Sequence, residues 1–245
     1  MNEKMFLNIN NYKNFIKIFI VFDNPFKFIF SLIFRKVPGQ ITLKTPIGKI
    51  SVSLRNYESL KTIFSIFCRN DYFVNNEKIF HFMDIGSNCG YSALYFLTRN
   101  NLNTVDCYEP DKENIEYLEM NLKSFSERVK IKNVGIGVKL GSADFYVAKD
   151  GKYSSLLPQH NTIESYKIEL VSFNDEIEML SLKKKNILIK IDVEGMEEEL
   201  IKSIDFVNKK FVKQIIVESV NCSKLIQKKH NRKLINGYIE HIQFY

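Results

Sequence analysis

The segment spanning residues 82–91 limits the fold of this chain more than any other part of the sequence. It reads Phe-Met-Asp-Ile-Gly-Ser-Asn-Cys-Gly-Tyr and overlaps a mostly apolar run, Ile79–Met83, that ends at Asp84. Gly86 and Gly90 let the backbone turn sharply before an amphipathic stretch begins. The pattern therefore predicts a buried strand, a tight loop and a helix, which is the usual entry to a nucleotide-binding sheet.

A second acidic position points to an adenosine-containing cofactor. The run Thr104–Tyr108 ends at Glu109, which lies 23 residues after Gly86. A carboxylate that follows the second strand of a doubly wound sheet can accept hydrogen bonds from ribose hydroxyls. Without this carboxylate, the glycine-rich loop would also fit a plain connection between a strand and a helix.

The spacing of the loop distinguishes between cofactors. It reads Asp84-x-Gly86-x-Asn88-x-Gly90, whereas a dinucleotide loop reads G-x-G-x-x-G and places a helix N-terminus against a pyrophosphate. S-adenosylmethionine (SAM) has no phosphate, and its sulfonium and ammonium groups are favoured near a carboxylate such as Asp84. The sequence therefore predicts SAM rather than a dinucleotide.

Composition excludes several other classes. A length of 245 residues with 45% hydrophobic residues fits one α/β domain with a modest extension. The formal charge of +7 suggests nucleic acid, but lysine occurs along the whole chain, so biased residue usage explains it and nucleic acid is a minor alternative. The four cysteines lack C-x-x-C or Cys/His ligand spacing, so we expect neither a zinc site nor a disulfide framework. We assign no metal, and we expect the protein in a reducing cytoplasm.

The N-terminal segment is rich in Phe, Ile and Leu between Phe15 and Phe34. Asp23, Pro25 and two lysines divide it into apolar runs of fewer than ten residues, and a bilayer needs about 20. No small-residue cleavage site follows, so it does not resemble a secretory signal. We expect a helical arm packed on the domain; the alternative is peripheral contact of residues 11–36 with a membrane surface.

Two regions follow from the pattern along the chain. Residues 1–75 are predicted to form a cap made of the helical arm, a β-hairpin over 41–54 and a helix over 56–68. Residues 76–245 are predicted to form the SAM-binding domain. Alternation of strands and helices from Ile79 onward predicts a doubly wound, mostly parallel, Rossmann-like sheet with helices on both faces. Its further strands are expected at Val129–Val134, Asn186–Ile191 and Gln214–Glu218, with an antiparallel excursion over Ala143–Val147.

A second group of polar residues lies at the end of a buried strand. Lys190, Asp192 and Glu194 occur in the segment Ile-Leu-Ile-Lys-Ile-Asp-Val-Glu-Gly-Met, residues 187–196. Ligands of open α/β sheets bind beyond the carboxyl ends of the strands, so Asp192 should face the same crevice as Glu109.

The segment Lys-Ile-Asp-Val-Glu-Gly resembles the signature of the FkbM family of SAM-dependent methyltransferases. The loop from Asp84 to Tyr91, the Tyr-Glu-Pro-Asp segment 108–111 and the Ser-Ser-Leu segment 154–156 are similar to other parts of that family, in the same order. The resemblance covers about residues 41–218. It implies a class I methyltransferase fold and O-methyl transfer to a hydroxyl, often on a sugar or a small molecule. The SAM-binding residues that we expect are Asp84, Gly86, Ser87, Asn88, Gly90, Tyr91, Glu109, Pro110, Gly137 and Asp192.

The chain departs from the family pattern in two places. Residues 134–138, Val-Gly-Ile-Gly-Val, lack the acid that many methyltransferases present to the adenine amine, so adenine recognition is expected to rest on backbone atoms near Gly137. The chain also ends soon after Tyr238, which leaves little length for the last two strands of a seven-stranded sheet. We therefore expect an abbreviated end.

Catalysis is assigned to Asp192 and Glu194. Asp192 is the expected general base for the acceptor hydroxyl, and Glu194 is either an alternative base or a ligand of the acceptor. Against this, Asp192 could bind only the methionine part of SAM, and Glu194 could cap the helix that begins near Met196. His81 is expected to be structural and His160 a solvated loop residue.

Three functions fit these observations. The favoured one is an O-methyltransferase that acts on a glycan or a small molecule. A nucleic-acid methyltransferase acting on an adenine amine would show an Asn/Asp-Pro-Pro-Tyr/Phe loop after the fourth strand, and residues 192–195 read Asp-Val-Glu-Gly. A non-catalytic SAM-binding module of the same fold is the third. The oligomeric state and the acceptor do not follow from the sequence.

Overall fold

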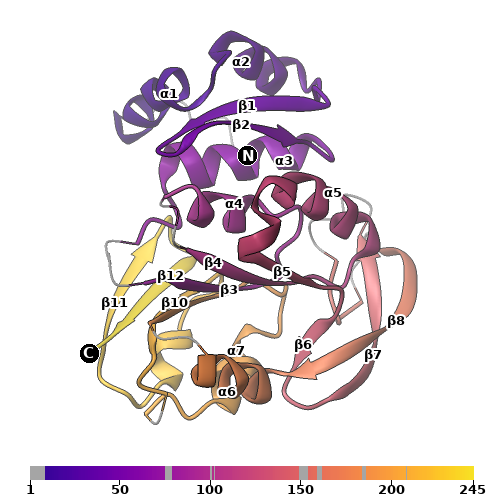
Figure 1. Cartoon of the computed structure of the whole chain (residues 1–245), viewed down its shortest axis with the longest axis vertical. Coiled ribbons are helices and arrows are strands. Elements are labelled where there is room, and N and C mark those ends of the chain that lie inside the picture. Colours follow the sequence, from indigo (N-terminus) through magenta and orange to yellow (C-terminus); the bar gives the residue numbers. More distant parts are fainter. Residues whose placement is uncertain are drawn as a thin grey trace.

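The computed structural model describes residues 9–74, 79–99, 101, 103–148, 154–158, 162–183, 186–207 and 209–245, the side chains of 9–13 and 183 excepted. Within these residues, seven strands form one central sheet in the order β11-β12-β10-β9-β3-β4-β5. Neighbours from β10 to β5 pair in parallel, whereas β12 is antiparallel to both β10 and β11. Helices cover both faces (Figure 1). The predicted doubly wound, mostly parallel sheet is confirmed.

The five parallel strands lie close to the positions that the sequence predicts. They are β3 (His81–Ile85), β4 (Thr104–Tyr108), β5 (Val129–Lys132), β9 (Ile187–Ile191) and β10 (Val212–Val217). Every residue of β3 and β9 is buried, as expected for strands covered on both faces. The carboxyl ends of these strands therefore meet at one edge of the sheet.

Two helices lie on each face of the central sheet. On one face lie α4 (Tyr91–Leu97) and α5 (Lys112–Leu122), and on the other lie α6 (Phe173–Lys183) and α7 (Glu197–Ser203) (Figure 1). Asp111 caps the N-terminus of α5, because its carboxylate accepts hydrogen bonds from the backbone N–H groups of Glu113 and Asn114. A short 3-10 helix, η3 (Lys123–Arg128), follows α5.

The C-terminal end completes the sheet, so the expectation of an abbreviated end is wrong. Strands β11 (His230–Ile235) and β12 (Ile239–Phe244) form a hairpin whose turn holds Asn236 and Gly237 at positive φ. The connection from β10 to this hairpin contains only the 3-10 helix η4 (Cys222–Leu225). The turn has three residues, 236–238, far fewer than a helical crossover needs, so a short tail can supply both strands.

A second sheet stands beside the first. Its strands are β6 (Gly135–Gly137), β7 (Gly141–Ala148) and β8 (Thr162–Ser172), paired in the order β6-β8-β7. We call it the side sheet. The predicted antiparallel excursion over 143–147 corresponds to the middle of β7.

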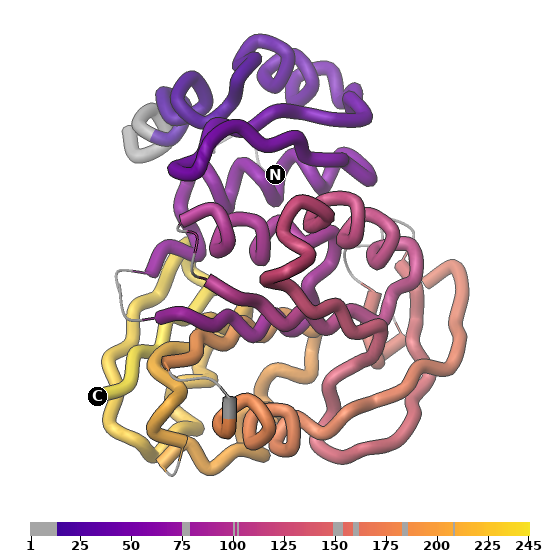
Figure 2. Tube along the Cα trace, viewed as in Figure 1, coloured from indigo at the N-terminus to yellow at the C-terminus, as the bar shows by residue number. Residues whose placement is uncertain are grey.

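The N-terminal part stacks on the α4–α5 side of the central sheet (Figure 2). It contains α1 (Ile9–Val21), α2 (Pro25–Phe34), the hairpin of β1 (Gln40–Thr45) and β2 (Gly48–Ser53), α3 (Tyr57–Ile63) and the π-helix η2 (Phe64–Arg69). Its apolar side chains belong to the same buried cluster as those of α4 and α5. The two regions that the sequence predicts, 1–75 and 76–245, therefore share a core, and the division between them stays a prediction. Among the described residues, no helix is both long and apolar enough to cross a membrane.

Candidate active site

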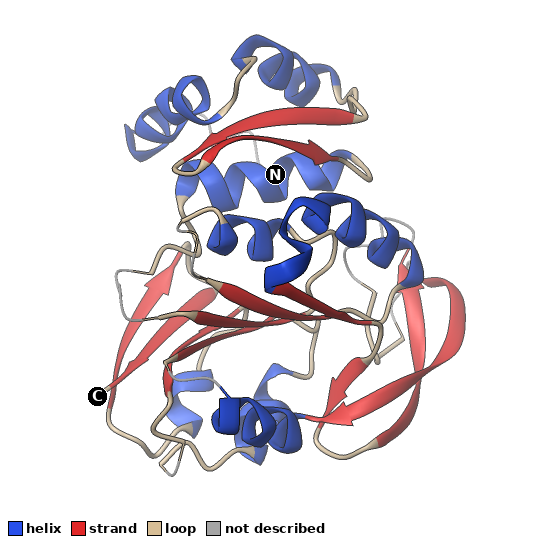
Figure 3. Ribbon diagram, viewed as in Figure 1, coloured by secondary structure: helices blue, strands red, loops and turns tan. Residues whose placement is uncertain are grey.

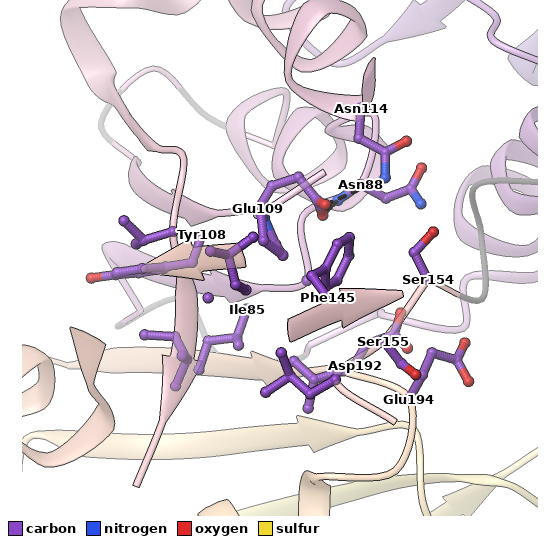
Figure 4. A pocket seen from close by; sticks show the side chains of 18 of the residues that line it. Ile85, Asn88, Tyr108, Glu109, Asn114, Phe145, Ser154, Ser155, Asp192 and Glu194 are labelled. Carbon is purple, nitrogen blue, oxygen red and sulfur yellow. Dashed lines mark hydrogen bonds between the residues drawn. The ribbon is translucent and has the colours of Figure 1, made fainter. Parts of the chain in front are cut away.

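A cavity opens where the central sheet meets the side sheet. Its volume is about 780 Å³, including space open to solvent. The loops that follow β3, β4 and β9 contribute Gly86, Glu109 and Asp192, while the side sheet contributes Phe145. Figure 4 shows Glu109 and Asn88 on one side of the cavity, and Asp192 and Glu194 on the other. The two motifs that the sequence singles out thus face a common space.

Gly86 allows the loops after β3 and β9 to touch. It has φ +73°, and a Cβ atom on it would lie 1.9 Å from the carbonyl oxygen of Asp192. The backbone N–H of Asp192 also donates to the carbonyl of Ile85 at 3.2 Å. Only glycine fits a backbone in this conformation against another backbone so close. The cofactor loop and the predicted catalytic loop therefore form one unit.

Glu109 is buried at the cavity wall with a largely satisfied carboxylate. Its Oε2 accepts from the backbone N–H of Asn88 at 2.7 Å, and its Oε1 accepts from the N–H of Asp111 at 2.9 Å and the amide of Asn114 at 3.3 Å. Burial raises the pKa of Glu109 to about 7, although the hydrogen bonds from Asp111 and Asn88 oppose this shift. A carboxylate with about four acceptor sites keeps capacity for a ribose hydroxyl.

Asp84, the first acid of the loop motif, lies beneath the loop and does not line the cavity. It is fully buried, and its carboxylate accepts from the hydroxyl of Ser92 at 2.5 Å. The ammonium of Lys190 lies 3.3 Å from a carboxylate oxygen of Asp84 and donates to the carbonyl of Gly86 at 2.8 Å. Burial raises the pKa of Asp84, and Lys190 and Ser92 oppose that shift. Its position is that of an internal support for Lys190.

Lys190 connects this support to Asp192. Its ammonium lies 3.3 Å from Oδ2 of Asp192, whose side chain is 24% exposed and lines the cavity. Burial alone would lower the pKa of Lys190, but Asp84, Asp192 and Glu218 together raise it above its usual value. Lys190 is therefore a cation at neutral pH and fixes the Asp192 carboxylate in place.

Other expected cofactor residues occupy supporting positions. Ser87 donates from its hydroxyl to the carbonyl of Asp84 at 2.7 Å and accepts from the N–H of Tyr108 at 3.1 Å, which ties the loop to β4. Gly90 has φ +84°, and Tyr91 donates from its hydroxyl to the carbonyl of Ser53 at 3.0 Å. Ser87, Gly90 and Tyr91 do not line the cavity. They shape the loop from behind.

The apolar wall of the cavity comes from the start of the side sheet. Val134, Gly135 and Ile136 line it together with Pro110, whereas Gly137, the residue expected to lie near adenine, does not. The three residues before Gly137 therefore line the cavity at this point, and the contact of Gly137 with adenine stays a prediction.

The loop after β9 is held by an acid that the sequence reading did not assign a role. Glu197 is buried, and its carboxylate accepts from the backbone N–H groups of Val193 at 3.2 Å and Gly195 at 2.9 Å. Glu194 has φ +52° and lines the cavity. The sequence offers only a slight signal for such a brace, a glutamate two residues after a glycine and at the first position of a helix.

The remaining candidates are spread over the structure. Ser154 and Ser155, from the Ser-Ser-Leu segment, line the cavity. His81 is buried at the amino end of β3, where its Nδ1 lies 2.9 Å from the hydroxyl of Thr104. That is the end of the sheet opposite the cavity. His160 lies outside the described residues.

Glu218 and Tyr72 form a polar contact near Lys190 that the sequence did not predict. The hydroxyl of Tyr72 donates to the carboxylate of Glu218, and the Lys190 ammonium lies 6.0 Å from the centre of the Tyr72 ring. Burial and then the charge of Glu218 raise the pKa of Tyr72 well above its usual value, so it remains a neutral donor.

Comparison with known families identifies the family of this chain. The Methyltransferase FkbM domain matches residues 84–236, more than half of the chain. The chain belongs to this family. It is a SAM-dependent methyltransferase, and the resemblance of the Lys-Ile-Asp-Val-Glu-Gly segment is confirmed. None of the curated proteins matches the sequence.

Solved structures with similar folds are methyltransferases of low sequence identity. Precorrin-6y C5,15-methyltransferase from Geobacter metallireducens is 10% identical, covers 78% of this chain and 90% of its own, and has a TM-score of 0.41. An O-methyltransferase family protein from Burkholderia thailandensis is 7% identical, with 77% and 56% covered and a TM-score of 0.42. TrmK from M. capricolum, solved with S-adenosylhomocysteine (SAH), is 11% identical, with 71% and 64% covered and a TM-score of 0.39.

The cavity of this chain fits SAM. Gly86 keeps the loop free of a side chain where the β3 and β9 loops touch, and Glu109 presents a carboxylate to the cavity beside the second strand. Asn88, Glu109 and Pro110 would hold the ribose side, and Val134, Gly135 and Ile136 would hold the adenine. Asp192 would lie toward the methionine part and the reacting methyl group.

Proposed function

We propose that this protein O-methylates a hydroxyl group of a glycan or a small molecule. The observation that carries the proposal is the partly exposed carboxylate of Asp192, which Lys190 fixes at the cavity beside Gly86. An alcohol loses its proton during methyl transfer, so a fixed carboxylate at the reacting end of the cofactor suits a hydroxyl acceptor.

The chain has three tasks in this reaction. Bound SAM supplies a methyl group activated by its sulfonium. Glu109 and the loop around Gly86 orient the cofactor, and the acceptor must be aligned in line with the methyl carbon; this alignment supplies much of the barrier reduction. Asp192 then accepts the hydroxyl proton, an effect that is typically about 10²- to 10⁴-fold in rate.

Glu194 has the role of acceptor ligand in this proposal. It lines the cavity from the loop after β9, and the hydrogen bonds of Glu197 to the backbone of that loop hold Glu194 in position. Vicinal hydroxyls of a sugar donate readily to such a carboxylate. The alternative base is Glu194 itself, and mutation separates the two roles.

The test begins with the acceptor. Purified protein is incubated with SAM and with extracts fractionated into glycans, lipids and RNA, and SAH formation identifies the active fraction. Turnover with glycans or small molecules supports the proposal, and turnover with RNA alone contradicts it. SAH binding without turnover in any fraction would identify a SAM-binding module and also overturn it.

Asp192→Asn is the decisive variant once an acceptor is known. It keeps the shape of the side chain and removes its basicity, so kcat should fall about 10²-fold or more while SAH affinity changes little. Glu194→Gln should mainly raise the KM of the acceptor. Loss of SAH affinity in proportion to rate in Asp192→Asn would make Asp192 a cofactor ligand and move the base to Glu194.

A further inference from the structure

Helices α1 and α2 expose an apolar surface to solvent. Phe19, Ile20, Phe26, Phe30, Ile33 and Phe34 are between 43% and 71% exposed, and we call these six residues the arm surface. Ring contacts join its two helices, since the centres of Phe19 and Phe26 lie 5.8 Å apart. Figure 3 shows both helices on the side of the β1–β2 hairpin that faces away from the central sheet.

The opposite faces of the same helices already pack on the protein. Ile18, Phe22 and Phe28 are buried, with the rings of Phe22 and Phe28 stacked 3.7 Å apart. The usual polarity is inverted in α2, because the polar Ser31 is buried while the apolar Phe26 and Phe30 are exposed. A helix that is apolar on all sides normally has its second face covered as well, and a large exposed apolar patch marks an interaction surface.

The first 50 residues, which hold the arm and most of the β1–β2 hairpin, carry nearly all of the net charge of the protein. Residues 1–50 contain eight Lys and Arg against two Asp and Glu, a net of +6, and the other 195 residues contain 27 against 26, a net of +1. Lysine does occur along the whole chain, but the net charge is uneven, because acidic residues balance the basic ones after residue 50. Lys27, Arg35 and Lys36 are exposed near the arm surface, while Asp23 is paired with Lys49 at 2.7 Å.

We propose that the arm surface docks on the surface of an anionic lipid membrane. Phe side chains would enter the boundary between headgroups and acyl chains while the flanking cations contact acidic headgroups. A second copy of this chain is disfavoured as the occupant, because a two-fold symmetric contact would bring the basic N-terminal region, net +6 over residues 1–50, against its own equivalent. The short helices would lie on the membrane, in agreement with the absence of a long apolar helix among the described residues.

Co-sedimentation of the full-length protein with vesicles tests the proposal. Vesicles of phosphatidylcholine with about 30% phosphatidylserine should bind the protein at least tenfold more tightly than pure phosphatidylcholine, and added salt should weaken binding. The triple variant Phe26→Ser, Phe30→Ser, Ile33→Ser should lose at least tenfold in affinity. The matched control changes three exposed apolar residues outside the arm, Leu140, Ile163 and Leu182, to Ser, and should bind as the wild type does.

Two further variants separate charge from apolar contact. Arg35→Gln with Lys36→Gln should weaken binding to the acidic vesicles by roughly 25-fold, since each basic side chain near an anionic surface is worth about fivefold. The chain contains no Trp. Phe26→Trp therefore gives a single tryptophan, and its emission should shift to shorter wavelength on acidic vesicles. The tryptophan of Leu182→Trp should show no such shift.

Several results would overturn the proposal. Equal binding by wild-type protein and the arm triple variant would exclude the arm surface as the contact. A wild-type protein that ignores vesicles but is a dimer, and becomes a monomer in the arm triple variant, would identify a second copy as the occupant. SAH affinity should be unchanged in every variant, which keeps this test independent of the proposed function.

Discussion

Gly86→Ala should damage both stability and cofactor binding because of one backbone contact. A side chain at φ +73° costs about 1 to 2 kcal/mol. The new Cβ would lie 1.9 Å from the carbonyl oxygen of Asp192, well inside the 3.0 Å below which a neighbour must shift. That shift displaces the loop after β9 and weakens the hydrogen bond from the N–H of Asp192 to the carbonyl of Ile85. Strain, overpacking and the lost hydrogen bond together cost about 3 to 6 kcal/mol.

Gly237→Ala is the matched control for backbone strain. Gly237 has φ +82°, and nothing lies within 4 Å of its would-be Cβ atom, so only strain of about 1 to 2 kcal/mol is expected. Gly90→Ala should be intermediate, because its Cβ would meet the movable side chain of Leu118 at 2.6 Å. The order of damage should follow what each Cβ atom meets.

Thermal and urea unfolding measure these costs, and calorimetry with SAH measures binding. About 2 to 4 °C of Tm is lost per kcal/mol in a chain of this size, so Gly86→Ala should melt at least 6 °C below the wild type. Its SAH affinity should fall more than tenfold, with Gly237→Ala unchanged in binding. If Gly86→Ala and Gly237→Ala melted within 2 °C of each other and bound SAH equally, the contact between the two loops would be refuted.

The other predictions concern the buried acids Glu109, Asp84 and Glu197. Because the pKa of Glu109 rises from 4.5 to about 7 on folding, the ligand-free protein should lose about 3 kcal/mol of stability through this group as the pH rises between these values, and Glu109→Gln should abolish this loss in urea titrations. SAH affinity in the wild type should grow up to about tenfold from pH 6 to pH 8 as the carboxylate ionises, with no such change in Glu109→Gln. Lys190→Met should cost about 3 to 5 kcal/mol by leaving Asp84 unpaired, and a second change, Asp84→Asn, should restore part of it in urea unfolding. Glu197→Ala should raise the KM of the acceptor and cost about 1 to 3 kcal/mol, because two N–H groups lose their acceptor, while Glu197→Gln should be milder in both assays.

The sequence predicts the central sheet well because its signals are local. A nearly all-apolar run such as Ile187–Ile191, interrupted only by Lys190, has few alternatives to a buried strand, and Gly86 and Gly90 mark the sharp turn after β3. The C-terminal hairpin was missed for the opposite reason. Its strand β11 is mostly exposed and polar, so no apolar run announces it, and pairing with β12 supplies the hydrogen bonds that fix it.

Side-chain direction is what the sequence could not provide at the site. Asp84 lies one residue before the end of β3, close to the predicted position, yet its carboxylate turns inward to Lys190 because that ammonium is buried and needs anionic partners. The gap in the assignment of Glu197 has a similar cause. A glutamate in the first turn of α7 looks like an ordinary helix-dipole residue, and only the folded loop brings two N–H groups to its oxygens.

These buried contacts explain why the cofactor loop and the catalytic loop should respond together. Lys190 binds the carbonyl of Gly86 on one side and the carboxylate of Asp192 on the other, and Asp84 supplies the charge that keeps the ammonium in place. Moving either loop therefore changes the position of the other through a single cation. A residue that never meets a ligand, Asp84, then controls both SAM binding and the proposed proton acceptor, so its loss should affect kcat and SAH affinity at the same time. Variants of Asp192 alone should separate these two quantities.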